Sequence, residues 1–115
     1  MKNSNGVELS KYPLAYSGAR TAKGGTGVGT SGCQAEGVKG LLVGDKIRYA
    51  DGSEAIVTSG SGNACNDSNR GCAVLGSHVS GGDHIVSTPV EGMVLWIGED
   101  DRPKGFLVEM WVGRG

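Results

Sequence analysis

Short apolar runs alternate with glycine and polar residues along most of the chain. The runs hold four or five residues, are rich in β-branched side chains and are bounded by Gly, Asn, Asp and Ser, as is typical of short β-strands. The sustained i, i+3, i+4 apolar spacing of an amphipathic helix does not occur after Leu14. We therefore predict an all-β fold with strands at residues 40–43, 46–49, 54–58, 72–75 and 84–87.

Three stretches, residues 17–31, 43–59 and 75–88, are versions of one pattern. Each has a glycine, a small or acidic residue, a long polar residue, a glycine-bearing turn, a short β-branched run and two hydroxyl residues. A unit this short cannot enclose a core of its own, so the repeat predicts three units around a shared pseudo-threefold axis. A chance similarity within a glycine-rich chain is the alternative.

The two ends of the chain fall outside the repeat. Residues 1–13 are mostly polar and predict a loose arm. Within 91–115, apolar runs at 93–97 and 106–112 flank the polar stretch 99–105, which predicts a C-terminal β-hairpin. This hairpin holds both tryptophans and the only phenylalanine. It either covers the rest of the domain, the interpretation we favour, or docks against a partner.

Composition narrows the class of protein. Of the 115 residues, 37% are apolar, a thin supply for a large spherical core, whereas 22 are glycine, which suits many tight turns. The net charge of −1 does not provide the basic face that nucleic-acid binding requires. No apolar run has the length of a membrane span, and residues 1–10 lack the apolar segment of a secretion signal. We expect a single domain that is made in the cytoplasm, or exported by a route that reads the folded protein.

Three cysteines leave an odd thiol. Cys65 and Cys72 flank a polar stretch that is typical of a surface loop. These two can bridge in an oxidising compartment, whereas free thiols are favoured in the cytosol. Both states stay open at this point.

The repeats resemble those of the PAAR-repeat proteins. Residues 43–47, Val-Gly-Asp-Lys-Ile, followed after the turn by residues 55–61, Ala-Ile-Val-Thr-Ser-Gly-Ser, look like one unit of that family. Residues 73–88 look like its closing unit. The resemblance covers residues 14–90 and leaves the two ends of the chain outside.

The resemblance implies a small cone of three short β repeats that caps a trimeric β-helical spike protein. Such spikes belong to type VI secretion systems and contractile phage tails, and the tip sharpens them for membrane piercing. Many members of the family also link effectors to the spike. The implied partners are the spike, an effector cargo and a target membrane contacted mechanically, with no nucleic acid. The implied location is the cytoplasm before assembly, and afterwards the tip of the spike or virion.

A cone that narrows to a point leaves little room for side chains, which favours glycine at its turns. The predicted turn residues are Gly24, Gly25, Asp51, Gly52, Gly81 and Gly82. One β-branched residue per repeat is expected near the axis, and the alignment assigns Val28, Ile56 and Ile85 to it.

Many members of the family bind zinc near the tip through histidine and cysteine. The matching positions here hold Lys23, Tyr49 or Asp51, and Gly81. The candidate ligands for a zinc or iron ion are then His84 with Asp83 or with Asp51. A structural zinc site needs about four converging ligands, so the residues favour a tip held by hydrogen bonds and packing, without a cofactor.

Catalytic patterns are weak in this chain. Ser77-His78 and Asp83-His84 are neighbours in sequence, but neighbours on a strand point to opposite faces, so neither pair is automatically a catalytic dyad. We expect a structural protein rather than an enzyme. The alternative is a small β-rich ligand-binding or hedgehog/intein-like module, and a closed barrel with an internal cavity would favour ligand binding.

Overall fold

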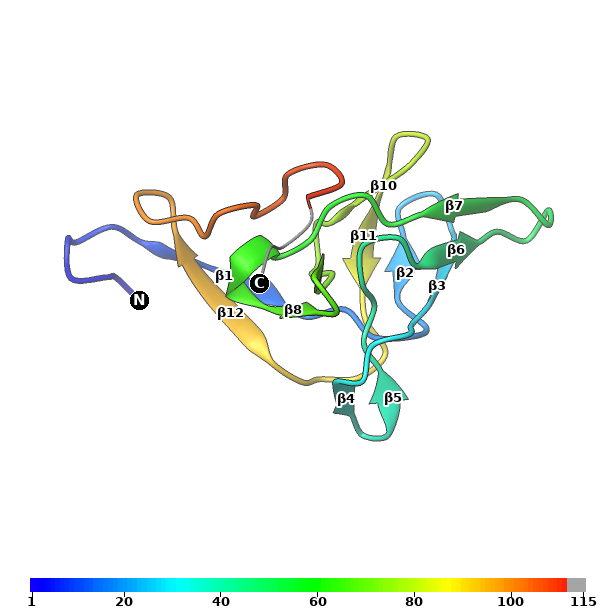
Figure 1. The fold of residues 1–115 in the computed structure, drawn as a ribbon, viewed down its shortest axis with the longest axis horizontal. Helices are drawn as coiled ribbons and strands as arrows, with labels where there is room; N and C mark the ends of the chain where they lie inside the picture. The colour runs from blue at the N-terminus through cyan, green and yellow to red at the C-terminus, as the bar shows by residue number, and fades with distance from the viewer. Residues whose placement is uncertain (112–115) are drawn as a thin grey trace.

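The computed structural model describes residues 1–111, and these form an all-β fold, as predicted (Figure 1). The elements are β1 (Leu9–Pro13), β2 (Arg20–Thr21), β3 (Thr26–Val28), β4 (Gln34–Ala35), β5 (Val38–Lys39), β6 (Lys46–Arg48), β7 (Glu54–Ile56), η1 (Gly62–Ala64), β8 (Asn66–Asp67), β9 (Arg70–Gly71), β10 (His78–Val79), β11 (Asp83–Ser87) and β12 (Val94–Gly98). Within the described residues, no helix is long and apolar enough to cross a membrane. Of the predicted strands, 40–43 and 72–75 make single-residue bridges instead.

Six strands form one sheet that closes into a small barrel. The sheet order is β10-β11-β2-β3-β6-β7, and a bridge between Val57, which follows β7, and Val79 of β10 joins its two ends. Each repeat contributes one hairpin, and the second strand of each hairpin pairs with the first strand of the next. We call β2–β3, β6–β7 and β10–β11 the barrel hairpins.

Three short segments lead into the barrel hairpins and bind one another in a closed cycle. The segments are residues 14–16, 40–42 and 72–74. The N–H of Ala15 donates to the carbonyl of Ala73, that of Leu41 to Ala15 and that of Ala73 to Leu41, each at 2.9 Å. The flanking bridges are Leu14 to Val74, Tyr16 to Gly40 and Leu42 to Cys72. We call this cycle the central ring, and it confirms the predicted pseudo-threefold arrangement.

A left-handed glycine ends each segment of the central ring. These are Gly18, Gly44 and Gly76, with φ of 97°, 94° and 96°. A side chain would strain this conformation, so a glycine is favoured at this turn in all three repeats. The following residue caps the turn in two repeats: Asp45 Oδ2 accepts from the N–H of Leu42 at 2.8 Å, and Ser77 Oγ accepts from that of Val74 at 2.9 Å.

The first repeat obtains the same cap from elsewhere. Ala19, in the place of Asp45 and Ser77, has no side-chain acceptor. The N–H of Tyr16 donates instead to Oγ1 of Thr88, which lies just beyond β11, at 3.1 Å. The buried amide therefore keeps a partner although the repeat has lost its own.

Three further hairpins project from the central ring (Figure 1). They are β4–β5, β8–β9 and β1–β12, and we call them the basal hairpins. In each hairpin, one strand runs into the ring, and the first ring residue donates its N–H to the carbonyl of the residue that precedes the partner strand. These bonds run from Gly40 to Cys33, from Cys72 to Cys65 and from Leu14 to Met93, each at 2.9 Å. The basal hairpins therefore follow the same pseudo-threefold arrangement as the ring.

The basal hairpin β1–β12 joins the two ends of the chain, and this corrects two predictions. Residues 1–13, predicted as a loose arm, contain β1, which pairs antiparallel with β12 from Leu9↔Gly98 to Pro13↔Val94. The strand predicted at 93–97 is present as β12, but its partner is β1 rather than residues 106–112. Strands β1 and β12 therefore belong to the threefold architecture, although they lie outside the repeat seen in the sequence.

Residues 106–111 form turns rather than the second strand of a hairpin, and the end of that predicted strand lies outside the described residues. Leu107 and Met110 have positive φ, which is incompatible with a strand. The N–H of Leu107 donates to the carbonyl of Gly60 at 2.7 Å, and that of Met110 to Thr58 at 2.6 Å. This segment is thereby fastened along the connection that follows β7.

Side chains from all three repeats fill the barrel. They are Ala15, Ala19, Leu41, Ile47, Val57, Ala73, Val79 and Ile85, each at most 3% exposed. Leu41 stands where the other ring segments have alanine, and it fills the space beside Gly27: a Cβ on Gly27 would lie 2.7 Å from Leu41 Cδ1. In the other two repeats, the carbonyls of Val57 and Ile85 accept from the glycine that ends the ring segment, as the carbonyl of Gly27 does in the first. Val57 and Ile85 therefore occupy the position of Gly27. One large residue therefore offsets one missing side chain.

A second cluster covers the other face of the central ring. It consists of Leu14, Tyr16, Leu42, Cys72 and Val74, with Tyr12, Ala35, Val38, Cys65 and Leu95 of the basal hairpins packed against it. Successive residues of an extended segment point to opposite faces, so the middle residue of each ring segment faces the barrel and its neighbours face this cluster. The central ring is buried on both sides.

Only one of the three predicted axis residues lies inside. Ile85 is 1% exposed, whereas Val28 and Ile56 are 37% and 36% exposed. The inward positions of the first two repeats are Gly27 and Val57, one residue away. A shift of one residue along a strand exchanges its two faces, which accounts for the error.

The face assignment predicts opposite outcomes for two neighbouring substitutions. Val57→Asp places an unpaired charge in the barrel and should cost more than about 3 kcal/mol of unfolding free energy. Ile56→Asp points outward, opposite Lys46 in the β6–β7 register, and should cost less than about 1 kcal/mol. Urea unfolding of the two variants measures this, and equal losses would contradict the register.

The exchange of volume between Leu41 and Gly27 predicts coupled substitutions. Gly27→Val alone should lower the unfolding free energy by about 1–3 kcal/mol, because the new side chain collides with Leu41. Leu41→Ala alone should cost about 2–5 kcal/mol through the cavity it leaves. The double variant restores the combination of a β-branched residue and an alanine that the equivalent positions hold elsewhere in the chain, and it should cost clearly less than the sum. A double-mutant cycle from chemical unfolding checks this, and strict additivity would refute it.

Candidate functional site

The turns of the three barrel hairpins meet around one buried carboxylate, that of Asp83, which is 4% exposed. Its Oδ2 accepts from the Tyr49 hydroxyl at 2.7 Å. Its Oδ1 accepts from the backbone N–H of Lys23 at 3.0 Å and of His84 at 2.8 Å. Lys23, Tyr49 and Asp83 come from different repeats, so this one acid ties the three turns together.

These hydrogen bonds keep Asp83 ionised. Burial alone would raise the pKa of its carboxyl, but donors from Thr21, Tyr49 and the backbone of His84 and Lys23 hold the pKa at about 2. Burial and the bond to Asp83 raise the pKa of the Tyr49 phenol, so Tyr49 stays a donor. Asp83 and Tyr49 therefore form a structural anchor in which hydrogen bonds stabilise the buried carboxylate charge.

The predicted turn residues occupy the barrel-hairpin turns and take different parts there. Gly24, Gly52, Gly81 and Gly82 have φ between 82° and 89°, a conformation that requires glycine. Gly25 is needed for close packing, since a Cβ there would lie 2.8 Å from the Tyr49 ring. Asp51 is exposed and accepts from the hydroxyl and N–H of Ser53, which lower its pKa.

The candidate metal ligands Asp83 and His84 do not fit a tip metal. The Asp83 carboxylate is occupied by the donors from three turns, and His84 is exposed on the opposite face of β11. His84 lies across from His78, whose Nδ1 is 2.6 Å from Glu109 Oε1. Among residues 1–111, no group of three His, Cys, Asp or Glu side chains is placed to hold a metal ion.

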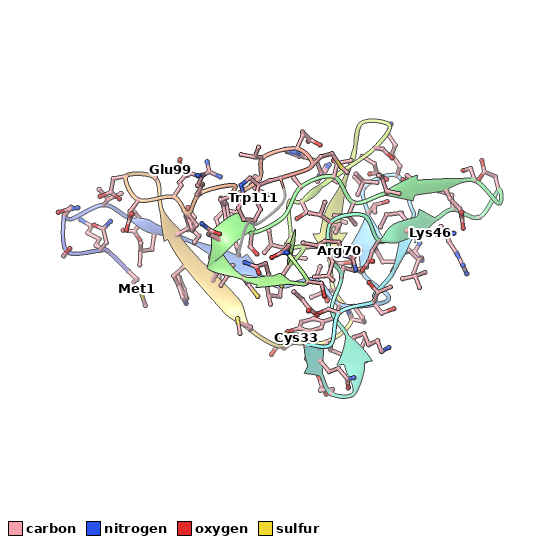
Figure 2. All side chains as sticks on the ribbon, in the orientation of Figure 1. Met1, Cys33, Lys46, Arg70, Glu99 and Trp111 are labelled. Atoms are coloured by element: carbon pink, nitrogen blue, oxygen red, sulfur yellow. The ribbon has the colours of Figure 1, made fainter. Side chains whose placement is uncertain are left out.

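An anchor that the sequence analysis missed connects the basal hairpin β8–β9 to the central ring. Asp45 is 4% exposed, and its carboxylate accepts from the N–H of Thr30 at 3.1 Å and from its hydroxyl at 2.6 Å. Arg70 of β9, which is labelled in Figure 2, places Nη1 3.4 Å from Asp45 Oδ1 and 3.2 Å from the carbonyl of Val43. The only sequence signal was the aspartate after the ring glycine in the second repeat.

A second contact joins the basal hairpin β8–β9 to the segment that leads into β4–β5. Asp67, the last residue of β8, accepts at Oδ2 from the N–H of Gly32 at 2.9 Å and from the hydroxyl of Ser31 at 3.1 Å. The bond from Gly32 and then that from Ser31 lower the pKa of Asp67. The chain leading into β4–β5 is thereby held against β8–β9.

In each pair considered as a catalytic dyad, the two residues lie on opposite faces of their segment. Ser77 is fully buried and its Oγ caps the Val74 amide, whereas His78 is on the surface. Asp83 and His84 are separated in the same way. The barrel interior is filled by side chains, which gives no support to an internally bound ligand.

Comparison with family models, with curated proteins and with solved structures finds no match for this chain.

The Asp83 anchor predicts acid sensitivity. Its folded pKa of about 2 lies below the ordinary value of 3.8, so its stabilisation is present above pH ~4 and disappears as the pH falls from about 4 to about 2. The unfolding free energy of Asp83→Asn should lie about 2 kcal/mol below that of the parent at pH 6, and the gap should close near pH 2.

Urea unfolding at pH 2–6 measures that gap. Asp101→Asn, at an exposed position, serves as the control and should keep the parent's pH dependence. A gap for Asp83→Asn that is independent of pH would mean that the carboxylate charge is not what stabilises the turns.

Proposed function

We propose that this protein caps the end of a trimeric β-helical spike and sharpens it for membrane piercing, as its PAAR-like repeats imply. One observation carries the proposal: a single chain closes three equivalent segments into a hydrogen-bonded ring. A monomer with internal threefold repetition matches the end of a threefold partner without breaking that partner's symmetry. The expected stoichiometry is one copy per three spike chains.

The basal hairpins supply the contact surface in this proposal. They stand at three equivalent positions, and each is a two-stranded sheet. An unpaired strand edge is a template for a strand of another chain, so each spike chain can extend one basal hairpin. The anchors at Asp45 and Asp67 support the proposal because they hold β8–β9 in place before the partner arrives.

The turn end of the barrel then points away from the spike. Its turns are held by the buried Asp83 carboxylate, and the side chains inside the barrel are at most 3% exposed. A packed interior has low compressibility, which suits a part under mechanical load. Effector cargo is a further partner in this proposal, and the protein stays in the cytoplasm until the spike assembles.

Binding to a trimeric β-helical spike protein encoded beside this chain tests the proposal. Native mass spectrometry should give one copy per spike trimer. A double variant on exposed residues of two basal hairpins, Gln34→Arg with Asn66→Arg, should weaken binding at least tenfold. The matched control at the turn end, Ala22→Arg with Ala50→Arg, should leave it unchanged. Absence of binding to every such spike, or loss of binding by the control variant alone, would refute the proposal.

A further inference from the structure

Two of the three cysteines face each other across the basal hairpin β8–β9. Cys65 precedes β8 and Cys72 follows β9, and the N–H of Cys72 donates to the Cys65 carbonyl at 2.9 Å. Their Sγ atoms are 2.9 Å apart, and both thiols are free. Facing residues of an antiparallel pair have Cα atoms about 4.5–5.5 Å apart, a separation that a disulfide spans.

We propose that Cys65 and Cys72 form an intramolecular disulfide when the protein enters an oxidising compartment, and that the bond locks β8–β9 onto the central ring. Cys72 bridges to Leu42 within that ring and is 3% exposed. A covalent link from Cys65 to Cys72 therefore fixes the start of the hairpin to the ring, next to the contact between Arg70 and Asp45. This inference does not depend on the proposed function.

The order of the thiol chemistry follows from exposure. Cys65 is partly exposed, and its hydrogen bond with Cys72 lowers its pKa to about 7 against the opposing effect of burial. A fraction of Cys65 is therefore thiolate at neutral pH, which is the attacking form. Cys72 is the buried partner, and its bond with Cys65 and its burial raise its pKa.

Oxidised glutathione, a small disulfide, serves as the oxidant. The Cys65 thiolate attacks one glutathione sulfur, the glutathione S–S bond breaks, and a mixed disulfide forms with release of one glutathione thiolate. That thiolate takes the proton of Cys72, whose sulfur then attacks Cys65 Sγ and expels the second glutathione, which is protonated by solvent. Two protein thiols are oxidised and one glutathione disulfide is reduced to two thiols.

The first basal hairpin provides an internal comparison. Cys33 occupies the position of Cys65, but the residue in the place of Cys72 is Gly40, whose N–H donates to the Cys33 carbonyl at 2.9 Å. Cys33 is exposed, at the start of β4–β5 (Figure 2). It has no cysteine in the facing position of its own hairpin, so it should remain a thiol.

Equilibration of the full chain in a glutathione redox buffer with the reduced form in excess tests the proposal, because a lone exposed thiol such as Cys33 then stays reduced while a facing pair can close. After acid quenching and denaturation, the number of reactive thiols should fall from three to one. Peptide mapping should link the segments that contain Cys65 and Cys72. Closing this short loop should raise the melting temperature by about 5–10 °C, reversibly with a reducing agent.

Two variants sharpen the result. Cys33→Ser should form the same bond, leave no thiol and show the same rise in melting temperature. Cys65→Ser should keep both remaining thiols and show no rise. Three thiols left in the parent chain, or a link that includes Cys33, would overturn the pairing. A Cys65–Cys72 bond that leaves the melting temperature unchanged would overturn the locking of the hairpin.

Discussion

Three backbone hydrogen bonds among Ala15, Leu41 and Ala73 hold the whole structure together. Each repeat donates to one neighbour and accepts from the other, and the ring is buried by the barrel on one face and by the basal cluster on the other. A buried N–H or carbonyl without a partner costs about 1–3 kcal/mol, so displacement of any one segment leaves both a donor and an acceptor unsatisfied. No repeat can separate from the ring without disturbing the other two.

The threefold regularity belongs to the backbone, whereas the side chains keep it by different means in each repeat. Leu41 fills the space at Gly27, and Thr88 supplies the cap that Ala19 cannot. The barrel turns share a single acid, Asp83, in place of three similar groups. The backbone hydrogen bonds are regular at the ring and the base, where a symmetric partner is proposed, whereas the side-chain contacts differ between the repeats.

The sequence predicted the fold class and the repeat because these rest on local chemistry. Gly44, for example, has the positive φ of a turn, and glycine in the sequence is enough to predict a turn at that position. The facing of Ile56 and Val57 was not predictable in the same way, since two adjacent β-branched residues fit either face of a strand. The acid Asp83 was identified, but as a metal ligand, because its donors Tyr49 and Lys23 belong to distant repeats. The pairing of β1 with β12 was missed for the same reason: a polar stretch becomes a strand only when its distant partner is present.

The split of one basal hairpin between the two ends of the chain determines when the protein can finish folding. Residues 9–13 leave the ribosome before residues 94–98 and wait for them to pair. The ring bond between Ala15 and Ala73 likewise closes a loop of about 60 residues. Such non-local pairing places folding toward the slow, millisecond-to-second end of the range for small domains. Until that closure, the edge of β1 is an unpaired strand on the nascent chain, open to association with other chains.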